Sequence, residues 1–249
     1  MIRRYKGLEE LSDAAADEFS RLVHDATATR GSCSVALAGG STPRRLYEIL
    51  ATPARKGKVQ WDRIDFFWGD ERAVPADHPG SNFRMAKQAL LDELAIRADH
   101  IHRIEAERED RDVAALDYQR EIARVLRAPS GGKPPAFDLV LLGMGADGHT
   151  ASLFPNTEVL GERERWVVGL HVPGLDTERV TMTAPILNAA RHLLFMVSGA
   201  DKASALAAVL EGPHDPMRLP AQLIRPISGA STWFVDEAAA AKLTMRPLP

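Results

Sequence analysis

The segment with the most specific chemical pattern is a glycine-rich stretch that carries an aspartate and a histidine. It reads Gly143-Met144-Gly145-Ala146-Asp147-Gly148-His149-Thr150 and follows a continuous apolar run. Histidine titrates near neutral pH, so its imidazole suits proton transfer to and from a reacting group. A nearby carboxylate could orient the ring, although Asp147 and His149 need a tight turn in order to meet. A lone histidine is usually structural, but this combination favours a functional role.

A second segment, Gly39-Gly40-Ser41-Thr42-Pro43, could form a phosphate-binding loop. Its two glycines let the backbone approach an anion closely, and Ser41 and Thr42 supply hydroxyl groups. A helix that begins there would add free N–H groups and the positive end of its dipole. The alternative is an ordinary strand-to-helix turn with a serine or threonine cap. The segment matches neither the nucleotide P-loop nor the dinucleotide-binding glycine pattern.

Two further segments place charged residues after expected strands. In Gly69-Asp70-Glu71-Arg72, the arginine can bind a phosphate through two parallel hydrogen bonds, while the acidic residues could act as bases or hold the arginine. In Val197-Ser198-Gly199-Ala200-Asp201-Lys202, the lysine could close over a phosphate as a point charge. Taken alone, these segments favour a solvated charged loop and a solvated lysine in a first helical turn.

The residue inventory predicts no metal site and a reducing environment. His100 and His102 are the one close pair among the remaining histidines, and neither His-Glu-x-x-His nor a paired-cysteine pattern occurs. The single cysteine, Cys33, lies among small and apolar residues, which indicates a buried hydrophobic side chain. It has no partner for an internal disulfide, which fits a cytoplasmic protein.

Charge and hydropathy argue against two classes of partner. The net charge is −3 and no lysine- or arginine-rich run occurs, so we expect no nucleic-acid surface. No stretch approaches the ~20 apolar residues of a membrane span, and the N-terminus has no apolar signal core. A phosphorylated substrate needs only a local pocket of positive charge, which a weakly acidic protein can hold.

Apolar runs and helical periodicities alternate along the chain, and these elements must position the segments above. The predicted strands are 35–38, 64–68, 138–142, 166–170, 193–197 and 233–235. The predicted helices are 8–23, 43–50, 81–94, 113–126, 202–210 and 237–243. The strand at 138–142 is apolar throughout, which is typical of burial on both faces. The alternation predicts an α/β fold with a mainly parallel sheet covered by helices on both faces.

The predicted topology gathers the polar segments at one place. Open α/β sheets bind ligands at the carboxyl ends of their strands, so the glycine-containing segments could all face one crevice. A proline- and glycine-rich stretch at 129–135 is short and lies between two elements of the same alternating pattern. No internal repeat is present. We therefore expect a single domain over residues 1–249.

Together these segments resemble the 6-phosphogluconolactonase family. The resemblance rests on 38–43, 68–72, 143–155 and 198–202, which occur in order over nearly the whole chain. The segment 143–155 is highly specific for this family, and the segments 38–43 and 68–72 are moderately specific. Membership implies a single domain with a modified Rossmann-like sheet and a place in the oxidative pentose phosphate pathway. We also expect a monomer that acts without a metal or organic cofactor.

The related glucosamine-6-phosphate deaminases share the phosphate loop and the Asp-Gly-His core. That family carries a glutamate, part of its proton relay, before the proline where this chain has Phe154. Phenylalanine cannot transfer a proton. Arg72 also stands where the deaminases usually have tyrosine. Both departures favour the lactonase over the deaminase.

The resemblance implies hydrolysis of 6-phospho-D-glucono-1,5-lactone, a strained and reactive ester, to 6-phospho-D-gluconate. His149 would take a proton from the attacking water, and Asp147 would orient or polarise its imidazole. The expected substrate- and phosphate-binding residues are Gly40, Ser41, Thr42, Asp70, Arg72 and Lys202. Asp70 could instead bind sugar hydroxyls. A deaminase–isomerase and a non-enzymatic sugar-phosphate sensor stay open as alternatives, although retention of His149 with Asp147 argues against a sensor.

Overall fold

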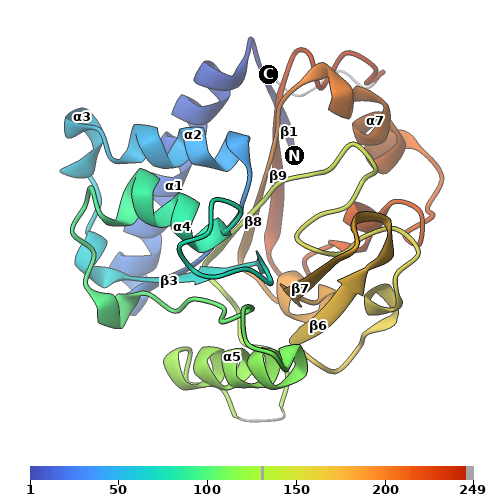
Figure 1. Ribbon diagram of the computed structural model, residues 1–249. Helices are drawn as coiled ribbons and strands as arrows, with labels where there is room; N and C mark the ends of the chain where they lie inside the picture. The colour runs from blue at the N-terminus through green and yellow to red at the C-terminus, as the bar shows by residue number, and fades with distance from the viewer. Residues whose placement is uncertain (130–131, 245–249) are drawn as a thin grey trace.

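The central feature of the fold is a six-stranded sheet in which every neighbouring pair of strands is parallel (Figure 1). The computed structural model describes residues 1–129 and 132–244. In sheet order the strands are β1 (Ile2–Tyr5), β9 (Ala230–Asp236), β8 (His192–Val197), β5 (Leu139–Leu142), β2 (Cys33–Leu37) and β3 (Ile64–Trp68). This sheet confirms the predicted fold class, and the pairing of β1 with β9 joins both ends of the chain.

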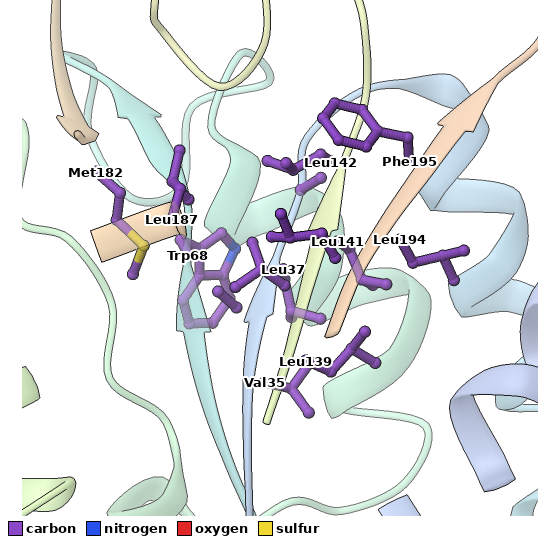
Figure 2. Packing of buried hydrophobic residues seen from close by; sticks show 14 of the residues in the cluster. Val35, Leu37, Trp68, Leu139, Leu141, Leu142, Met182, Leu187, Leu194 and Phe195 are labelled. Carbon is purple, nitrogen blue, oxygen red and sulfur yellow. The ribbon is translucent and has the colours of Figure 1, made fainter. Parts of the chain in front are cut away.

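The core lies on the central strands of this sheet. Every residue of β2 and of β5 is buried, which confirms the prediction made from the continuous apolar run. Figure 2 shows Leu37 and Leu141 of these strands close together, with Leu194 of β8 on the other side of Leu141. Cys33 is buried in the same core, and its burial raises the pKa of the thiol well above its ordinary value. The cysteine is therefore a structural apolar group.

Helices cover both faces of the sheet. Figure 1 shows α1 (Leu8–Arg30) and α2 (Ser41–Leu50) together on one side and α7 (Ala203–Glu211) on the other. The remaining α-helices are α3 (Pro53–Lys56), α4 (Asn82–Ala86), α5 (Arg111–Val125) and α6 (Ala184–Asn188). Shorter helical turns are η1 (Trp61–Arg63), η2 (Lys87–Leu91), η3 (Ala98–His100), η4 (Glu158–Gly161), η5 (Pro173–Leu175), η6 (Ala200–Lys202) and η7 (Pro220–Leu223).

A second, antiparallel sheet was not predicted. Its strands, in order, are β4 (Asp70–Arg72), β7 (Thr177–Met182) and β6 (Val167–Val172). The strand expected at 166–170 exists, but it belongs to this small sheet. Gly69 links the two sheets, because its N–H donates to Leu37 at 3.0 Å while its carbonyl accepts from Met182 at 2.8 Å. The predicted loop at 69–72 is therefore mostly a strand, which its polar residues concealed.

Two helix predictions need correction. The region 81–94 begins as α4 and continues as the π-helical turn η2, so the expected regular helix is interrupted. The region 237–243 forms turns, in which Glu237 donates to the Tyr5 carbonyl and Ala239 donates to the Asp236 carboxylate. Seven residues are too few for a stable helix without support. The predicted linker at 129–135 includes residues 130–131, which lie outside the described residues.

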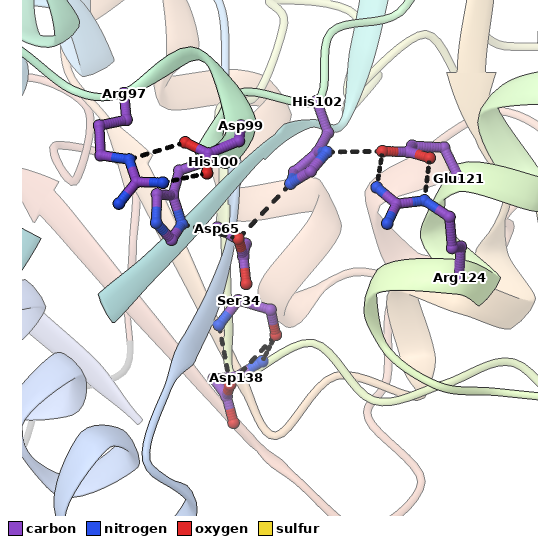
Figure 3. Close-up of polar contacts among 9 residues, drawn as sticks. All are labelled: Ser34, Asp65, Arg97, Asp99, His100, His102, Glu121, Arg124 and Asp138. Atoms are coloured by element: carbon purple, nitrogen blue, oxygen red, sulfur yellow. Dashed lines mark hydrogen bonds and ion pairs between the residues drawn. The ribbon is translucent and has the colours of Figure 1, made fainter. Parts of the chain in front are cut away.

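Polar side chains gather at the amino-terminal ends of the central strands (Figure 3). His102 is buried, and its ring nitrogens lie 2.8 Å from Glu121 and 3.5 Å from Asp65. Asp65 also contacts His100 at 3.0 Å. The His102 ring stacks on Phe67, with centroids 4.6 Å apart. Within 1–129 and 132–244, no group of three or more histidine, cysteine or acidic residues is arranged to hold a metal ion.

This cluster makes stability depend on pH. Burial alone would raise the pKa of Asp65, but hydrogen bonds from His102 and His100 lower it below its ordinary value overall. A depressed pKa in the folded state contributes stability above the unfolded-state pKa, and that contribution is lost as pH falls through the folded-state pKa. We expect Asp65→Asn to lower the free energy of unfolding at pH 5 by about 1–3 kcal/mol, as measured by urea denaturation.

The same measurement at lower pH provides the check. The difference between Asp65→Asn and the parent should shrink between about pH 5 and pH 3, where the parent loses the contribution of the carboxylate. Asp62→Asn, which changes an exposed aspartate nearby, should leave the pH dependence unaltered. A constant difference between parent and Asp65→Asn over this range would show that the carboxylate charge does not stabilise the fold.

Candidate active site

A pocket of about 350 Å³ opens where the carboxyl ends of β2, β3, β5 and β8 meet. The predicted residues that line it are Gly40, Ser41, Thr42, Asp70, Arg72, His149 and Lys202. Asp147 lines an adjoining groove that shares His149 and Lys202 with the pocket. The structure thus brings all eight predicted site residues together at one edge of the sheet.

A closed turn after β5 holds His149 against Asp147. Gly148 has φ +80° and donates its N–H to Gly145, whose own N–H donates to the His149 carbonyl. Asp147 Oδ1 lies 2.6 Å from His149 Nδ1 and accepts from the His149 N–H at 3.1 Å. Burial alone would raise the pKa of Asp147, but its hydrogen bonds with His149 lower it overall.

This contact assigns the two nitrogens of the imidazole. A carboxylate only accepts hydrogen bonds, so Nδ1 carries the proton and Nε2 is the nitrogen that can take one from a substrate or water. Gly145 leaves room for the arrangement, because a Cβ there would lie 2.1 Å from His149 Nδ1 and 2.4 Å from Asp147 Oδ1. The predicted orientation of the base by Asp147 therefore has the required geometry.

The loop after β2 presents a helix N-terminus to the pocket. Gly40 is the N-cap of α2, with φ +101°, and no described side chain caps this end of the helix. The expected alternative, a serine or threonine cap, is therefore not what forms. Gly39 packs against Asn82, whose Oδ1 lies only 1.9 Å from where a Cβ would be. Free N–H groups at Ser41 and Thr42 suit an anion.

Two arginines lie side by side on neighbouring strands of the small sheet. Arg72 of β4 pairs in register with Arg179 of β7, and both line the pocket. The Nε atom of each is buried without a hydrogen-bond partner among the described residues. Burial is the main cause that lowers the pKa of the Arg179 guanidinium, and Arg72 adds to it. Neighbouring like charges repel, so an anion bound between the two guanidinium groups would offset their repulsion.

The sequence did not point to Arg179. It lies in the alternating run Thr177–Met182, where a charged residue is expected at a solvent-facing position. Only the pairing of β7 with β4 brings it to the pocket, and that pairing joins residues more than one hundred positions apart. The third cation, Lys202, enters from the turn after β8 and lies 3.0 Å from Asp201.

Asp70 and Glu71 are buried, so the solvated-loop alternative is wrong. Asp70 lines the pocket and accepts from Ser152 Oγ at 2.6 Å and from Asn82 Nδ2 at 3.3 Å. Ser152 and Asn82 are two further residues that the sequence did not single out. The fixed carboxylate can accept hydrogen bonds from sugar hydroxyls.

Glu71 instead fixes the entry to α4. It accepts hydrogen bonds from the backbone N–H groups of Arg72, Asn82 and Phe83 and from the Ser81 hydroxyl. Burial raises the pKa of Glu71 despite these four bonds. All of its contacts are within the protein, and it does not line the pocket. Glu71 therefore ties the backbone of Arg72 to the first residues of α4.

Comparisons with known proteins show to which family the chain belongs. Residues 6–233 match the family model of glucosamine-6-phosphate isomerases/6-phosphogluconolactonase. The chain is 42% identical over 221 residues to the 6-phosphogluconolactonase of Synechocystis sp., covering 89% of each protein. It is 35% identical to that of Streptomyces coelicolor, covering 96% of this chain and 93% of the relative.

Solved structures show the same fold. The 6-phosphogluconolactonase of Trypanosoma brucei superposes with a TM-score of 0.85 and 29% identity over 98% of both chains. A monomeric glucosamine-6-phosphate deaminase superposes with a TM-score of 0.80 at 21% identity, covering 97% of this chain and 99% of its own. No helix in the described residues is long and apolar enough to cross a membrane. The chain belongs to the glucosamine-6-phosphate isomerase/6-phosphogluconolactonase family.

Proposed function

We propose that the protein is a 6-phosphogluconolactonase, which hydrolyses 6-phospho-D-glucono-1,5-lactone to 6-phospho-D-gluconate in the oxidative pentose phosphate pathway of the cytoplasm. The observation that carries this proposal is an oriented imidazole in the same pocket as a free helix N-terminus and three cationic side chains. The names of relatives at 42% identity support the same reaction. The protein would act as a monomer, without a metal or organic cofactor.

In the proposed reaction, His149 acts as a general base and then as a general acid. Nε2 takes a proton from a water molecule as the water oxygen bonds to the lactone carbonyl carbon. The tetrahedral intermediate then collapses, the bond from that carbon to the ring oxygen breaks, and the imidazolium returns the proton to the departing oxygen. Asp147 holds Nδ1 throughout and stabilises the transient positive charge. The carboxylic acid formed ionises in water.

Phosphate binding would place the carbonyl against this base. The N–H and hydroxyl groups of Gly40, Ser41 and Thr42 would hold the phosphate, together with Arg72 and Lys202. Asp70, fixed by Ser152, would accept from sugar hydroxyls. The phosphate is remote from the carbonyl, so its binding positions the reacting atoms without any direct contact to them. Arg179 adds a further positive charge to the same pocket.

The lactonase is preferred to the deaminase because of Phe154. The deaminases carry a relay glutamate at this point, and here a phenyl ring contacts His149 in the pocket. A phenyl ring cannot pass protons between the histidine and an amino sugar. The similar deaminase structure shares the fold at 21% identity, which supports no transfer of its activity to this chain.

A substrate comparison tests the proposal. The purified protein should accelerate acid release from freshly made 6-phosphogluconolactone, with spontaneous opening subtracted, and should release no ammonia from glucosamine 6-phosphate. Activity should be unchanged by a chelator. Ammonia release, or a loss of activity that chelator causes and added metal reverses, would overturn the proposal. His149→Ala is the matched control, since it shows whether any activity comes from this pocket.

A further inference from the structure

Phe154 stacks on the imidazole of His149, with ring centroids 4.2 Å apart and an angle of 29° between the planes. We propose that Phe154 is a positioning residue that fixes the plane of the His149 ring and so aims Nε2 at the attacking water. This inference rests on the proposed function, because it assigns Phe154 a role through the general base. It extends that function to a residue that cannot itself carry a proton.

The need for a second contact follows from the geometry of the first. Asp147 contacts the ring at one atom, Nδ1, at 2.6 Å. The ring is otherwise held only through its Cβ–Cγ bond, and a single hydrogen bond tolerates small turns about that bond, which would shift Nε2 relative to the water. A flat apolar surface against one ring face removes that rotation. The two contacts together determine the position and the plane of the base.

Stacking also matches the charge that the reaction creates. The imidazole becomes a cation when Nε2 takes the proton from water. The face of a phenyl ring carries partial negative charge, so it attracts a cation that lies over it. The ring shields that face of the imidazole from solvent without offering an acceptor for its protons. Phe154 is itself only 8% exposed, so little water reaches the contact.

The chain around Phe154 is built to hold its ring in this place. After His149 it makes a tight turn, in which Leu153 donates its N–H to the Thr150 carbonyl at 2.9 Å. Leu153 is fully buried and anchors the end of that turn in the core. The Phe154 carbonyl then accepts from Thr157 Oγ1 at 2.7 Å. The backbone that carries the phenyl ring is therefore fixed by contacts that do not involve the histidine.

The test replaces the ring and measures catalysis and binding separately. Phe154→Leu keeps an apolar side chain but removes the flat face, so kcat should fall about tenfold to a hundredfold, as expected for a misplaced catalytic group. The dissociation constant of 6-phosphogluconate should change less than about threefold, because the phosphate contacts remain. Phe154→Tyr keeps the ring and should recover most of the lost kcat. Leu116→Ala, which shortens an exposed apolar side chain of α5 outside the pocket, should leave kcat unchanged.

A double-mutant cycle separates positioning from general damage to the pocket. In a His149→Ala background, Phe154→Leu should cause no further loss of kcat, because the ring has no base left to aim. An equal loss in both backgrounds, an unchanged kcat in Phe154→Leu alone, or failure of Phe154→Tyr to recover activity would overturn the inference. If His149→Ala itself keeps full activity, the proposed function fails instead, so the two failures are distinguishable.

Discussion

Replacing His149 with alanine should lower kcat by about 10²–10⁴, the usual contribution of a positioned general base. The protein should still fold, because His149 lies in a loop at the pocket and is outside the apolar core. It should still bind 6-phosphogluconate, since none of the expected phosphate contacts is removed. Lactone hydrolysis under saturating substrate and calorimetric titration with 6-phosphogluconate measure the two quantities.

Asp147→Asn is the matched comparison for this variant. The amide can still contact Nδ1, but it lacks the charge that stabilises the imidazolium, so its loss of kcat should be smaller. The competing role for His149 is a hydrogen bond to a sugar hydroxyl. In that case His149→Ala would mainly raise KM and would leave kcat nearly unchanged, and the general-base role would have to be abandoned.

Removing the positive charge of the pocket should weaken binding of the phosphorylated product. Arg72→Ala and Lys202→Ala should each raise the dissociation constant of 6-phosphogluconate roughly 10- to 100-fold, because a charged hydrogen bond contributes ~1.5–3 kcal/mol. The structure offers a reason to expect a full effect at Arg72. Its Nη1 donates to the Gly80 carbonyl at 2.6 Å, which holds the guanidinium at the pocket, and its Nε is buried without a partner among the described residues.

Two controls show whether these losses come from the phosphate. Gluconate, which has no phosphate, should bind the variants and the parent with nearly the same affinity. Lys56→Ala removes a lysine from α3, outside the pocket, and should leave the affinity for 6-phosphogluconate unchanged. If Arg72→Ala and Lys202→Ala both bind 6-phosphogluconate like the parent, the phosphate lies elsewhere.

The parts of the fold that local pattern determines were predictable. The strand Ile64–Trp68 has the predicted bounds, and the apolar run that ends at Leu142 is buried on both faces as expected. Glycines followed by hydroxyl or charged residues marked the carboxyl ends of these strands, which is why the eight predicted residues gather at one edge. Periodicity and turn chemistry act over a few residues, so a single sequence displays them.

The second sheet depends on contacts that a local pattern does not display. Strand β4 is the polar tripeptide Asp70–Arg72, and only its pairing with β7 makes it a strand. The same pairing brings Arg179 to Arg72, so the missed strand and the missed cation have one cause. Asn82 was missed because its role depends on a close approach to Gly39 from a distant segment. Such contacts are set by tertiary packing.

The most direct test of the central claim is the pH dependence of lactone hydrolysis in the parent and in His149→Ala. The rate of the parent, corrected for spontaneous opening at each pH, should fall on acidification, because a protonated imidazole cannot take a proton from water. The residual rate of His149→Ala should show no such fall over the same range. An acid limb of the same shape in both proteins would contradict the assignment of His149 as the general base.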